Sequence, residues 1–198
     1  ALIEKQDLVL IKWMGTGLDC SFLRNLSAFM QQAKIKHLFL VADAGQDNLS
    51  LGLSKEQENK IYKYFNYGGI NNFENCLLWL TSEILGEKQF YYEPKLLPWN
   101  GIYHYASENI YEDLASYQSK YCRPNRPTIG LIFYRDEWIL GDLSYQSEII
   151  KALEARNLNV IAVFSNGQAN PDIDSEGLRE AFAKYFYQDT KPIIDVLI

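Results

Sequence analysis

Polar side chains that could bind a ligand follow an apolar stretch in the sequence GLIFYRDEWILGD, Gly130 to Asp142. Residues 128–134 are almost all apolar and β-favouring, which is typical of a strand covered on both faces of a parallel sheet. Open α/β sheets bind ligands outside the carboxyl ends of their strands, so Tyr134, Arg135 and Trp138 are candidate binding residues. Arg135 suits bidentate contact with a carboxylate, and Trp138 offers a flat apolar face. The alternative is a solvated turn.

The glycines of this stretch do not match a known phosphate-binding loop. A dinucleotide fingerprint needs three glycines at fixed spacing, and a Walker loop needs Gly-Lys-Ser/Thr after a glycine turn. Here Gly130 comes before the polar residues and Gly141 stands alone. We therefore expect no nucleotide to bind to this chain.

A second candidate is His104, in the stretch NGIYHYA. It lies among Trp99, Tyr103 and Tyr105, and a histidine in an aromatic loop can ligate a metal or relay a proton. It has no carboxylate, cysteine or second histidine at ligand spacing, so a hydrogen-bonded structural role is the main alternative. The sequence offers no nucleophile elbow and no paired acids, and we expect no catalytic residue and no metal ligand in this chain.

The periodicity of apolar residues predicts the elements that would position these side chains. Strands are predicted at residues 7–13, 36–43, 128–134, 159–164 and 192–198, and helices at 17–34, 55–67, 71–85, 109–121, 144–156 and 175–187. Gly68 and Gly69 separate two of the helices, and at least one of them should adopt a positive φ. The polar residues after residue 134 are expected to form a loop.

Strands and helices that alternate in this way favour an α/β fold, doubly wound, with mainly parallel Rossmann-like or flavodoxin-like sheets. We predict a partial α/β unit at residues 1–86, an aromatic, proline-bearing crossing segment at 87–126, and a βαβαβ unit at 127–198. The first predicted strand begins almost at once, and the chain ends inside the apolar run KPIIDVLI. Both ends therefore read as truncated, as in a piece of a larger protein.

Composition excludes some classes of function. The formal net charge of -6 gives no basic patch for nucleic acid. No apolar run approaches the length of a membrane span, and the start lacks the features of a signal peptide, so a cytoplasmic location is expected. The three cysteines are far apart and read as ordinary reduced thiols.

Three stretches, in order, resemble the large subunits of cobaltochelatase and magnesium chelatase. YFNYGGINNFENCLLWL is similar to a helix end, Gly-Gly pair and asparagine-bearing helix of that family, although Asn71 stands where an acid is usual. GIYHYASENIYEDLASY resembles its Gly-Ile-Tyr-His-Pro-Asp segment, with Tyr105 and Ala106 in place of Pro-Asp. The closest match runs from RPTIGLIFYRDEWILGD to IDVLI, and its Phe-Tyr-Arg and Trp-Ile-Leu-Gly favour the cobalt branch.

The resemblance implies a segment from the amino-terminal half of a much longer subunit. In this family the large subunit holds the tetrapyrrole while ATPase subunits drive metal insertion, a ligase reaction that forms nitrogen–metal bonds. The resemblance thus implies that the parent complex acts in cobalamin biosynthesis and uses ATP, Mg and Co. It implies no cofactor bound by this piece alone. Its expected partners are a corrin-precursor tetrapyrrole, the ATPase subunits and the rest of its own chain, with no nucleic acid and no membrane.

Alternatives stay open at this point. They are a magnesium chelatase large subunit acting in chlorophyll biosynthesis, a non-catalytic α/β interaction module, and a flavodoxin-like protein that binds a small anion. The candidate substrate-binding residues are Tyr103, His104, Tyr134, Arg135 and Trp138.

Overall fold

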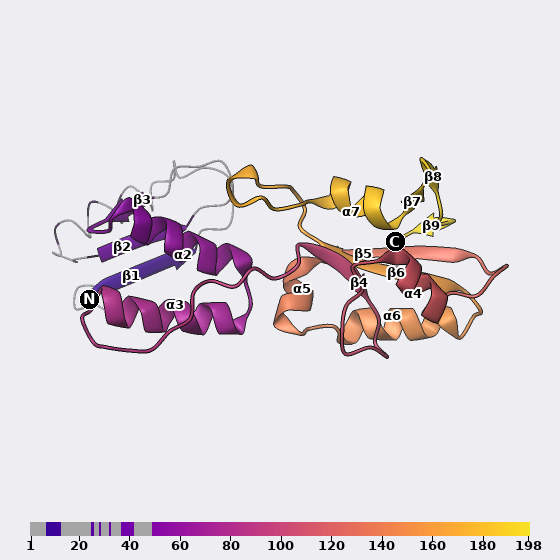
Figure 1. The fold of residues 1–198 in the computed structure, drawn as a ribbon, viewed down its shortest axis with the longest axis horizontal. Coiled ribbons are helices and arrows are strands. Elements are labelled where there is room, and N and C mark those ends of the chain that lie inside the picture. The colour runs from indigo at the N-terminus through magenta and orange to yellow at the C-terminus, as the bar shows by residue number, and fades with distance from the viewer. Residues whose placement is uncertain (1–6, 13–24, 26–27, 29–31, 33–36, 42–48) are drawn as a thin grey trace. The chain divides into compact units, whose positions relative to one another are not determined.

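The computed structural model describes residues 7–12, 25, 28, 32, 37–41 and 49–198. The chain divides into two compact units, one of residues 1–67 and 71–95 and the other of residues 68–70 and 96–198. Figure 1 shows the elements of both. In the described part of the chain, no helix combines the length and the apolar character that crossing a membrane requires.

The first unit contains a three-stranded sheet and two helices. Strands β1 (Leu8–Lys12) and β2 (His37–Val41) are parallel, and β3 (Leu49–Leu51) pairs antiparallel with β2. Helices α2 (Lys55–Tyr67) and α3 (Ile70–Glu83) follow. The two longer strands and both helices confirm the sequence prediction, whereas β3 was not predicted. The helix predicted at residues 17–34 lies mostly outside the described residues.

Apolar residues at helical spacing form the core of this unit. α2 contributes Ile61 and Tyr64, three residues apart, and α3 contributes Cys76, Trp79 and Leu80. Leu8 and Leu10 of β1 pack against this cluster. Burial raises the pKa of the Cys76 thiol to about 12, so this cysteine is inert at neutral pH.

Two asparagines of α3 hold the extended segment that follows the helix. The Asn72 side chain donates to the Lys95 carbonyl oxygen at 2.7 Å and accepts from the Lys95 amide at 2.8 Å. The Asn75 side chain accepts from the amide of Tyr92 at 2.7 Å. An amide side chain can thus pair with an extended backbone as a neighbouring strand does, which explains why asparagines are suited to these positions.

The second unit is built on a four-stranded sheet in the order β4-β6-β5-β9. Strands β5 (Thr128–Tyr134), β6 (Asn159–Ser165) and β9 (Val196–Leu197) are parallel, and β4 (Asn100–Tyr103) runs antiparallel to β6. The helices are α4 (Leu114–Tyr121), α5 (Arg135–Leu140), α6 (Ser144–Glu154) and α7 (Leu178–Tyr185), with a 3-10 turn, η2, at Pro171–Ile173. A short hairpin joins β7 (Tyr187–Gln188) to β8 (Lys191–Pro192).

Helices cover both faces of this sheet, as the apolar sequence of its strands predicts. Every residue of β6 is buried. Ile161 and Val163 pack with residues of α4 and α7, while Val160 and Ala162 pack with Ile150 of α6. Figure 1 shows α7 above the sheet and α6 below it. The α/β fold with mainly parallel sheets is thereby confirmed, and antiparallel β4 is an addition to it.

The polar residues after β5 form helix α5 where a loop was predicted. Asp136 and Glu137 lie in its first turn, where the helix dipole favours acidic side chains. Gly141 ends the helix in the left-handed conformation, with φ 74°. These helix signals are present in the sequence, but a helix of six residues is too short to show a periodic apolar face.

The last part of the chain also differs from the prediction. The strand predicted at 192–198 is divided between β8 and β9, with residues 193–195 between them. The helix predicted at 175–187 is shorter in the structure, where α7 spans Leu178–Tyr185. Gly177 is its N-cap residue, and the Glu180 side chain accepts a hydrogen bond from the Gly177 amide at 2.9 Å. The first helical turn is thereby capped three residues later than the apolar pattern indicates.

Gly68 and Gly69 both adopt the left-handed conformation that the sequence predicts for at least one of them. Their φ angles are +73° and +87°. A β-carbon on Gly68 would lie 2.8 Å from the Ile139 side chain, and one on Gly69 would lie 2.9 Å from Leu97. Conformation and close packing therefore both require glycine here.

Candidate functional site

The carboxyl ends of β5 and β6 lie together, as predicted for adjacent parallel strands. Tyr134, the last residue of β5, is opposite Ser165, the last residue of β6. A cavity of about 390 Å³ opens at this edge. Strands β5 and β6, helices α5, α6 and α7 and the loop after β6 line it, through Leu131, Ile132, Phe133, Tyr134, Glu137, Tyr145, Gln146, Ile149, Ser165, Gly167 and Leu178. We call this cavity the edge pocket.

Of the five candidate binding residues, Tyr134 lines the edge pocket and is 68% exposed. Its backbone is extended at the start of α5, with ψ 139°. An exposed phenol ring at the mouth of a cavity can stack on a flat ligand without rearrangement of the core.

Arg135 is adjacent in sequence but faces the protein interior. It is 2% exposed, and its guanidinium donates to the carbonyl oxygens of Pro98 at 2.7 Å and Leu97 at 3.0 Å. The guanidinium carbon also lies 4.4 Å from the ring centroid of Trp99. Burial lowers the pKa of Arg135 to about 10. The side chain therefore fixes residues 97–99 against the start of α5.

Trp138 stacks on Phe164 of β6, with ring centroids 4.3 Å apart and planes 7° apart. It is partly buried and is not among the residues that line the edge pocket. One face of its ring is therefore already occupied by the core. Binding roles for Arg135 and Trp138 stay predictions, and any such role would have to coexist with these internal contacts.

Tyr103 and His104 lie away from the carboxyl edge. β4 is antiparallel to β6, so Asn100 is opposite Ser165 while Tyr103 is opposite Ala162. The Tyr103 hydroxyl is 2.8 Å from the Ser147 hydroxyl of α6. The structure thus brings Tyr134, Arg135 and Trp138 to one edge and separates Tyr103 and His104 from them.

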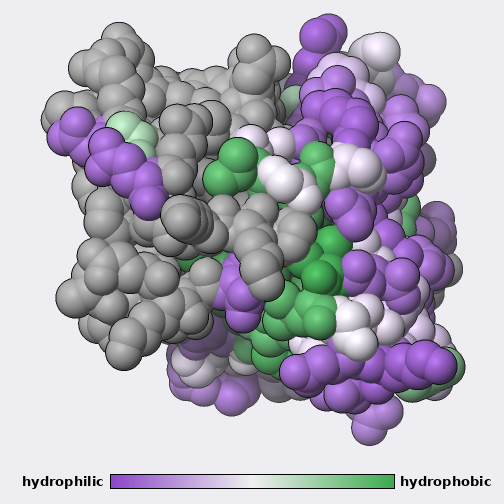
Figure 2. Space-filling view, turned by 90° about the vertical axis from the view of Figure 1, so that its left-hand side faces the viewer, coloured by the Kyte–Doolittle hydropathy of each residue, from purple (hydrophilic) through white to green (hydrophobic). Residues whose placement is uncertain are grey.

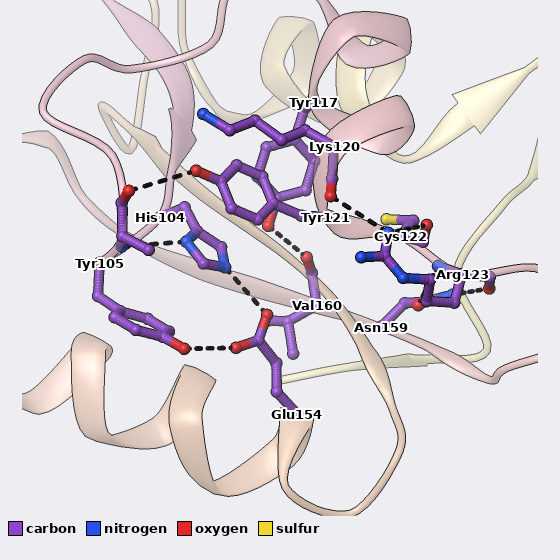
Figure 3. A network of polar contacts seen from close by, with 11 residues as sticks. His104, Tyr105, Tyr117, Lys120, Tyr121, Cys122, Arg123, Glu154, Asn159 and Val160 are labelled. Atoms are coloured by element: carbon purple, nitrogen blue, oxygen red, sulfur yellow. Dashed lines mark hydrogen bonds and ion pairs between the residues drawn. The ribbon is translucent and has the colours of Figure 1, made fainter.

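His104 is held inside an aromatic cluster (Figure 3). It is 2% exposed, and its ring stacks on Tyr121 at a centroid distance of 3.7 Å and on Tyr105 at 4.6 Å. Glu154, near the end of α6, contacts His104 Nε2 at 2.9 Å and accepts from the Tyr105 hydroxyl at 3.0 Å. The hydrogen bond to Glu154 raises the pKa of Tyr105.

The contacts of His104 define which ring nitrogen carries the hydrogen. Nδ1 accepts from the backbone amide of Ala106 at 3.1 Å, so it carries a lone pair. Nε2 is then the donor to Glu154. Both ring nitrogens of His104 make internal hydrogen bonds, and both ring faces are stacked. This is the hydrogen-bonded structural role that the sequence offers as the alternative to metal ligation or proton relay. A catalytic role would require this cluster to open.

Three polar or aromatic residues that line the edge pocket are not among the candidate binding residues from the sequence: Glu137, Tyr145 and Gln146. They belong to α5 and α6, and the sequence gives no sign that these two helices bring them to the same cavity. The nearest signal is position, since Glu137 lies three residues after the end of β5. Cys76 and Cys122 are free thiols, as expected, and Cys20 lies outside the described residues.

The described residues contain no group of three or more histidine, cysteine or acidic side chains arranged to hold a metal ion. The edge pocket itself combines aromatic faces and a few polar groups around an apolar cavity, which is an arrangement suited to binding a ligand.

Comparison with known protein families identifies the chain. A family model described as CobN/Magnesium Chelatase matches residues 62–198, well over half of the sequence. The chain belongs to this family. The matched region contains the whole of the second unit, so the edge pocket lies within the family domain.

Curated relatives of this CobN/magnesium chelatase family domain are much longer proteins. An uncharacterized protein of Methanocaldococcus jannaschii is 34% identical over 143 residues, which are 71% of this chain and 12% of that protein. The magnesium-chelatase subunit ChlH of Oryza sativa is 27% identical, over 57% of this chain and 9% of that protein. The aerobic cobaltochelatase subunit CobN of Pseudomonas aeruginosa is 26% identical, over 56% and 9%.

Among solved structures, the chain is similar to the catalytic subunit of cobaltochelatase from Mycobacterium tuberculosis. The TM-score is 0.49 at 16% sequence identity, with 93% of this chain and 14% of that chain covered.

Proposed function

We propose that this chain is part of the tetrapyrrole-binding large subunit of an ATP-dependent cobaltochelatase, which inserts cobalt into a corrin precursor in cobalamin biosynthesis. The family match over residues 62–198 carries this proposal. We propose cobalt rather than magnesium as the inserted metal because the Phe-Tyr-Arg and Trp-Ile-Leu-Gly sequences around α5 resemble the cobaltochelatase branch of the family. The ATPase subunits and the remainder of the large subunit are its partners, and the complex acts in the cytoplasm. A magnesium chelatase acting in chlorophyll biosynthesis is the alternative within the family.

The segment contributes one wall of the substrate cavity rather than the site of metal insertion. Support comes from the edge pocket, which is apolar over most of its lining and opens beside the exposed ring of Tyr134. A macrocycle has a large flat face, and an exposed tyrosine ring can stack on that face. Metal insertion also needs a proton acceptor and a route for the metal, for which other parts of the large subunit are responsible.

Replacement of Tyr134 tests this assignment in the full-length large subunit. Tyr134→Ala is expected to weaken tetrapyrrole binding by about fivefold, because ring stacking contributes on the order of 1 kcal/mol. The dissociation constant for a metal-free corrin precursor is measured by tryptophan quenching. Tyr92→Ala is the matched control, since Tyr92 is 67% exposed and belongs to the other unit. Equal affinity of the two variants would contradict a substrate wall at this edge.

A second candidate function is docking of another subunit through the segment that follows α3. Phe90 and Tyr92 in this segment are 75% and 67% exposed and pack edge to face on each other, with centroids 4.9 Å apart. Exposed aromatic pairs are frequent anchors of protein interfaces. Figure 2 shows apolar residues beside polar ones on one face of the molecule. Under this alternative, Tyr92→Ala would weaken subunit assembly and leave tetrapyrrole binding unchanged.

A further inference from the structure

We infer that the edge pocket binds a positively charged amine carried on a short apolar stem. This goes beyond the proposed function, because it assigns the pocket a ligand chemistry that needs no macrocycle and no metal. It follows from the charge and the hydrogen-bonding capacity of the groups that line the cavity.

The pocket has a carboxylate in an otherwise uncharged lining. Glu137 is partly buried and is the acidic residue among the lining side chains, which include no lysine or arginine. The remaining walls are mainly apolar, with Leu131, Phe133 and Ile149 among them. A carboxylate beside apolar walls attracts a cation more strongly than it would in open water, because the local dielectric constant is lower.

Two exposed tyrosines add a second attraction for a cation. Tyr134 and Tyr145 both line the pocket and are 68% and 74% exposed. The face of an aromatic ring is negative and attracts ammonium groups within about 6 Å of its centre. A cavity of about 390 Å³ holds a ligand of the size of a substituted benzene ring with its head group.

Apart from the two tyrosine hydroxyls, which can donate or accept, the polar side chains of the lining present acceptors. Gln146, on α6, donates through Nε2 to the Glu137 carboxylate, so its Oε1 is the remaining acceptor. Gln146 is 5% exposed, and within the described part of the chain its Oε1 has no hydrogen-bond donor. The hydroxyl of Ser165 donates to the Asn166 carbonyl oxygen at 3.0 Å, which leaves its lone pairs as acceptors. An ammonium head, with three donors and no acceptor, complements such a set.

A carboxylate ligand is disfavoured by the same arrangement. It would bring a second negative charge towards Glu137 and would meet acceptors at Gln146 and Ser165. Arg135, the cation nearest in sequence, is buried and donates to Pro98 and Leu97 instead of lining the cavity. The pocket therefore discriminates by charge, with an apolar stem supplying most of the contact area.

Binding of three benzene derivatives to the full-length protein tests the inference. The probes are benzylamine, benzyl alcohol and benzoate, which share a ring and differ in the charge of the head group. Ligand-observed saturation-transfer NMR gives their dissociation constants near neutral pH. We expect benzylamine to bind most tightly and benzoate least. Equal affinities, or tighter binding of benzoate, would overturn the inference.

Two variants locate the binding. Glu137→Gln is expected to weaken benzylamine binding by about tenfold and to leave benzyl alcohol nearly unchanged, since only the charge-assisted contact is lost. Glu148→Gln is the matched control, because Glu148 lies on α6, is exposed and pairs with Lys151 instead of lining the pocket. Loss of benzylamine binding in both variants, or in neither, would refute the site.

Tyr145→Ala gives an independent check if Glu137→Gln is poorly folded. Tyr145 is 74% exposed, so its truncation should leave the core intact while removing one aromatic wall. Weaker benzylamine binding supports the site, and unchanged binding contradicts it. The probes are not tetrapyrroles, so a negative result here leaves the proposed function standing, and loss of tetrapyrrole binding leaves the amine site standing.

Discussion

Arg135→Ala is expected to lower the free energy of unfolding by about 4 kcal/mol, since two part-buried hydrogen bonds to carbonyl oxygens are lost and a buried side chain leaves a void. The guanidinium donates to Pro98 and Leu97 and lies over the ring of Trp99, and the Arg135 side chain is among the largest fully buried ones. Chemical denaturation of the purified protein measures the loss. Lysine should not restore it, because an ammonium group cannot make the same planar contacts.

Arg123→Ala is the matched control for this prediction. Arg123 also donates to backbone carbonyl oxygens, at Lys120 and Cys122, but its side chain is exposed. Its replacement should change the free energy of unfolding by no more than about 0.5 kcal/mol. A similar small change for Arg135→Ala would show that the guanidinium does not hold residues 97–99 in place, and would favour the predicted role of Arg135 in ligand binding.

The Gly68→Val, Gly69→Val double variant is expected to lose about 4 kcal/mol of unfolding free energy. Each valine would have to adopt a positive φ, at a cost of roughly 1–2 kcal/mol per residue, and would also press on Ile139 or Leu97. Thermal or urea denaturation reports the change. The larger effect is expected on the unit that contains α5, because Gly68, Gly69 and both contacted side chains belong to it.

Gly141→Val separates conformational strain from crowding. Gly141 has φ +74°, but a β-carbon there meets nothing within 4 Å. It should therefore cost only the strain of one residue, about 1–2 kcal/mol. If the double variant is no less stable than Gly141→Val, the close packing around Gly68 and Gly69 has no energetic weight.

The sequence predicts the parallel strands of the second unit because both faces of β5 and β6 are buried, which makes their apolar runs continuous. It does not predict β4, since NGIY is short and its partner β6 is some 60 residues away in sequence. Pairing of that kind depends on tertiary contacts rather than on a local pattern. Helix α5 was missed for the opposite reason, because its few residues offer capping signals without periodicity.

The candidate site was predicted in part. Strand order and direction place Tyr134 at the carboxyl edge, and a parallel pair must put Ser165 beside it. The sequence cannot tell that Arg135 turns inward, because a charged residue after a strand is usually solvated. Only the packing of residues 97–99 against α5 provides the carbonyl oxygens and the Trp99 ring that make its burial possible.

Hydrogen exchange of the full-length large subunit with and without a metal-free corrin precursor tests the central claim most directly. Ligand binding should slow exchange in residues 131–149 and 165–167, which contain most of the lining of the edge pocket, and leave the His104 cluster unchanged. A metal-free porphyrin used as a second ligand should protect the same residues less. Protection confined to other parts of the subunit, with residues 131–149 unaffected, would contradict a substrate wall at this edge.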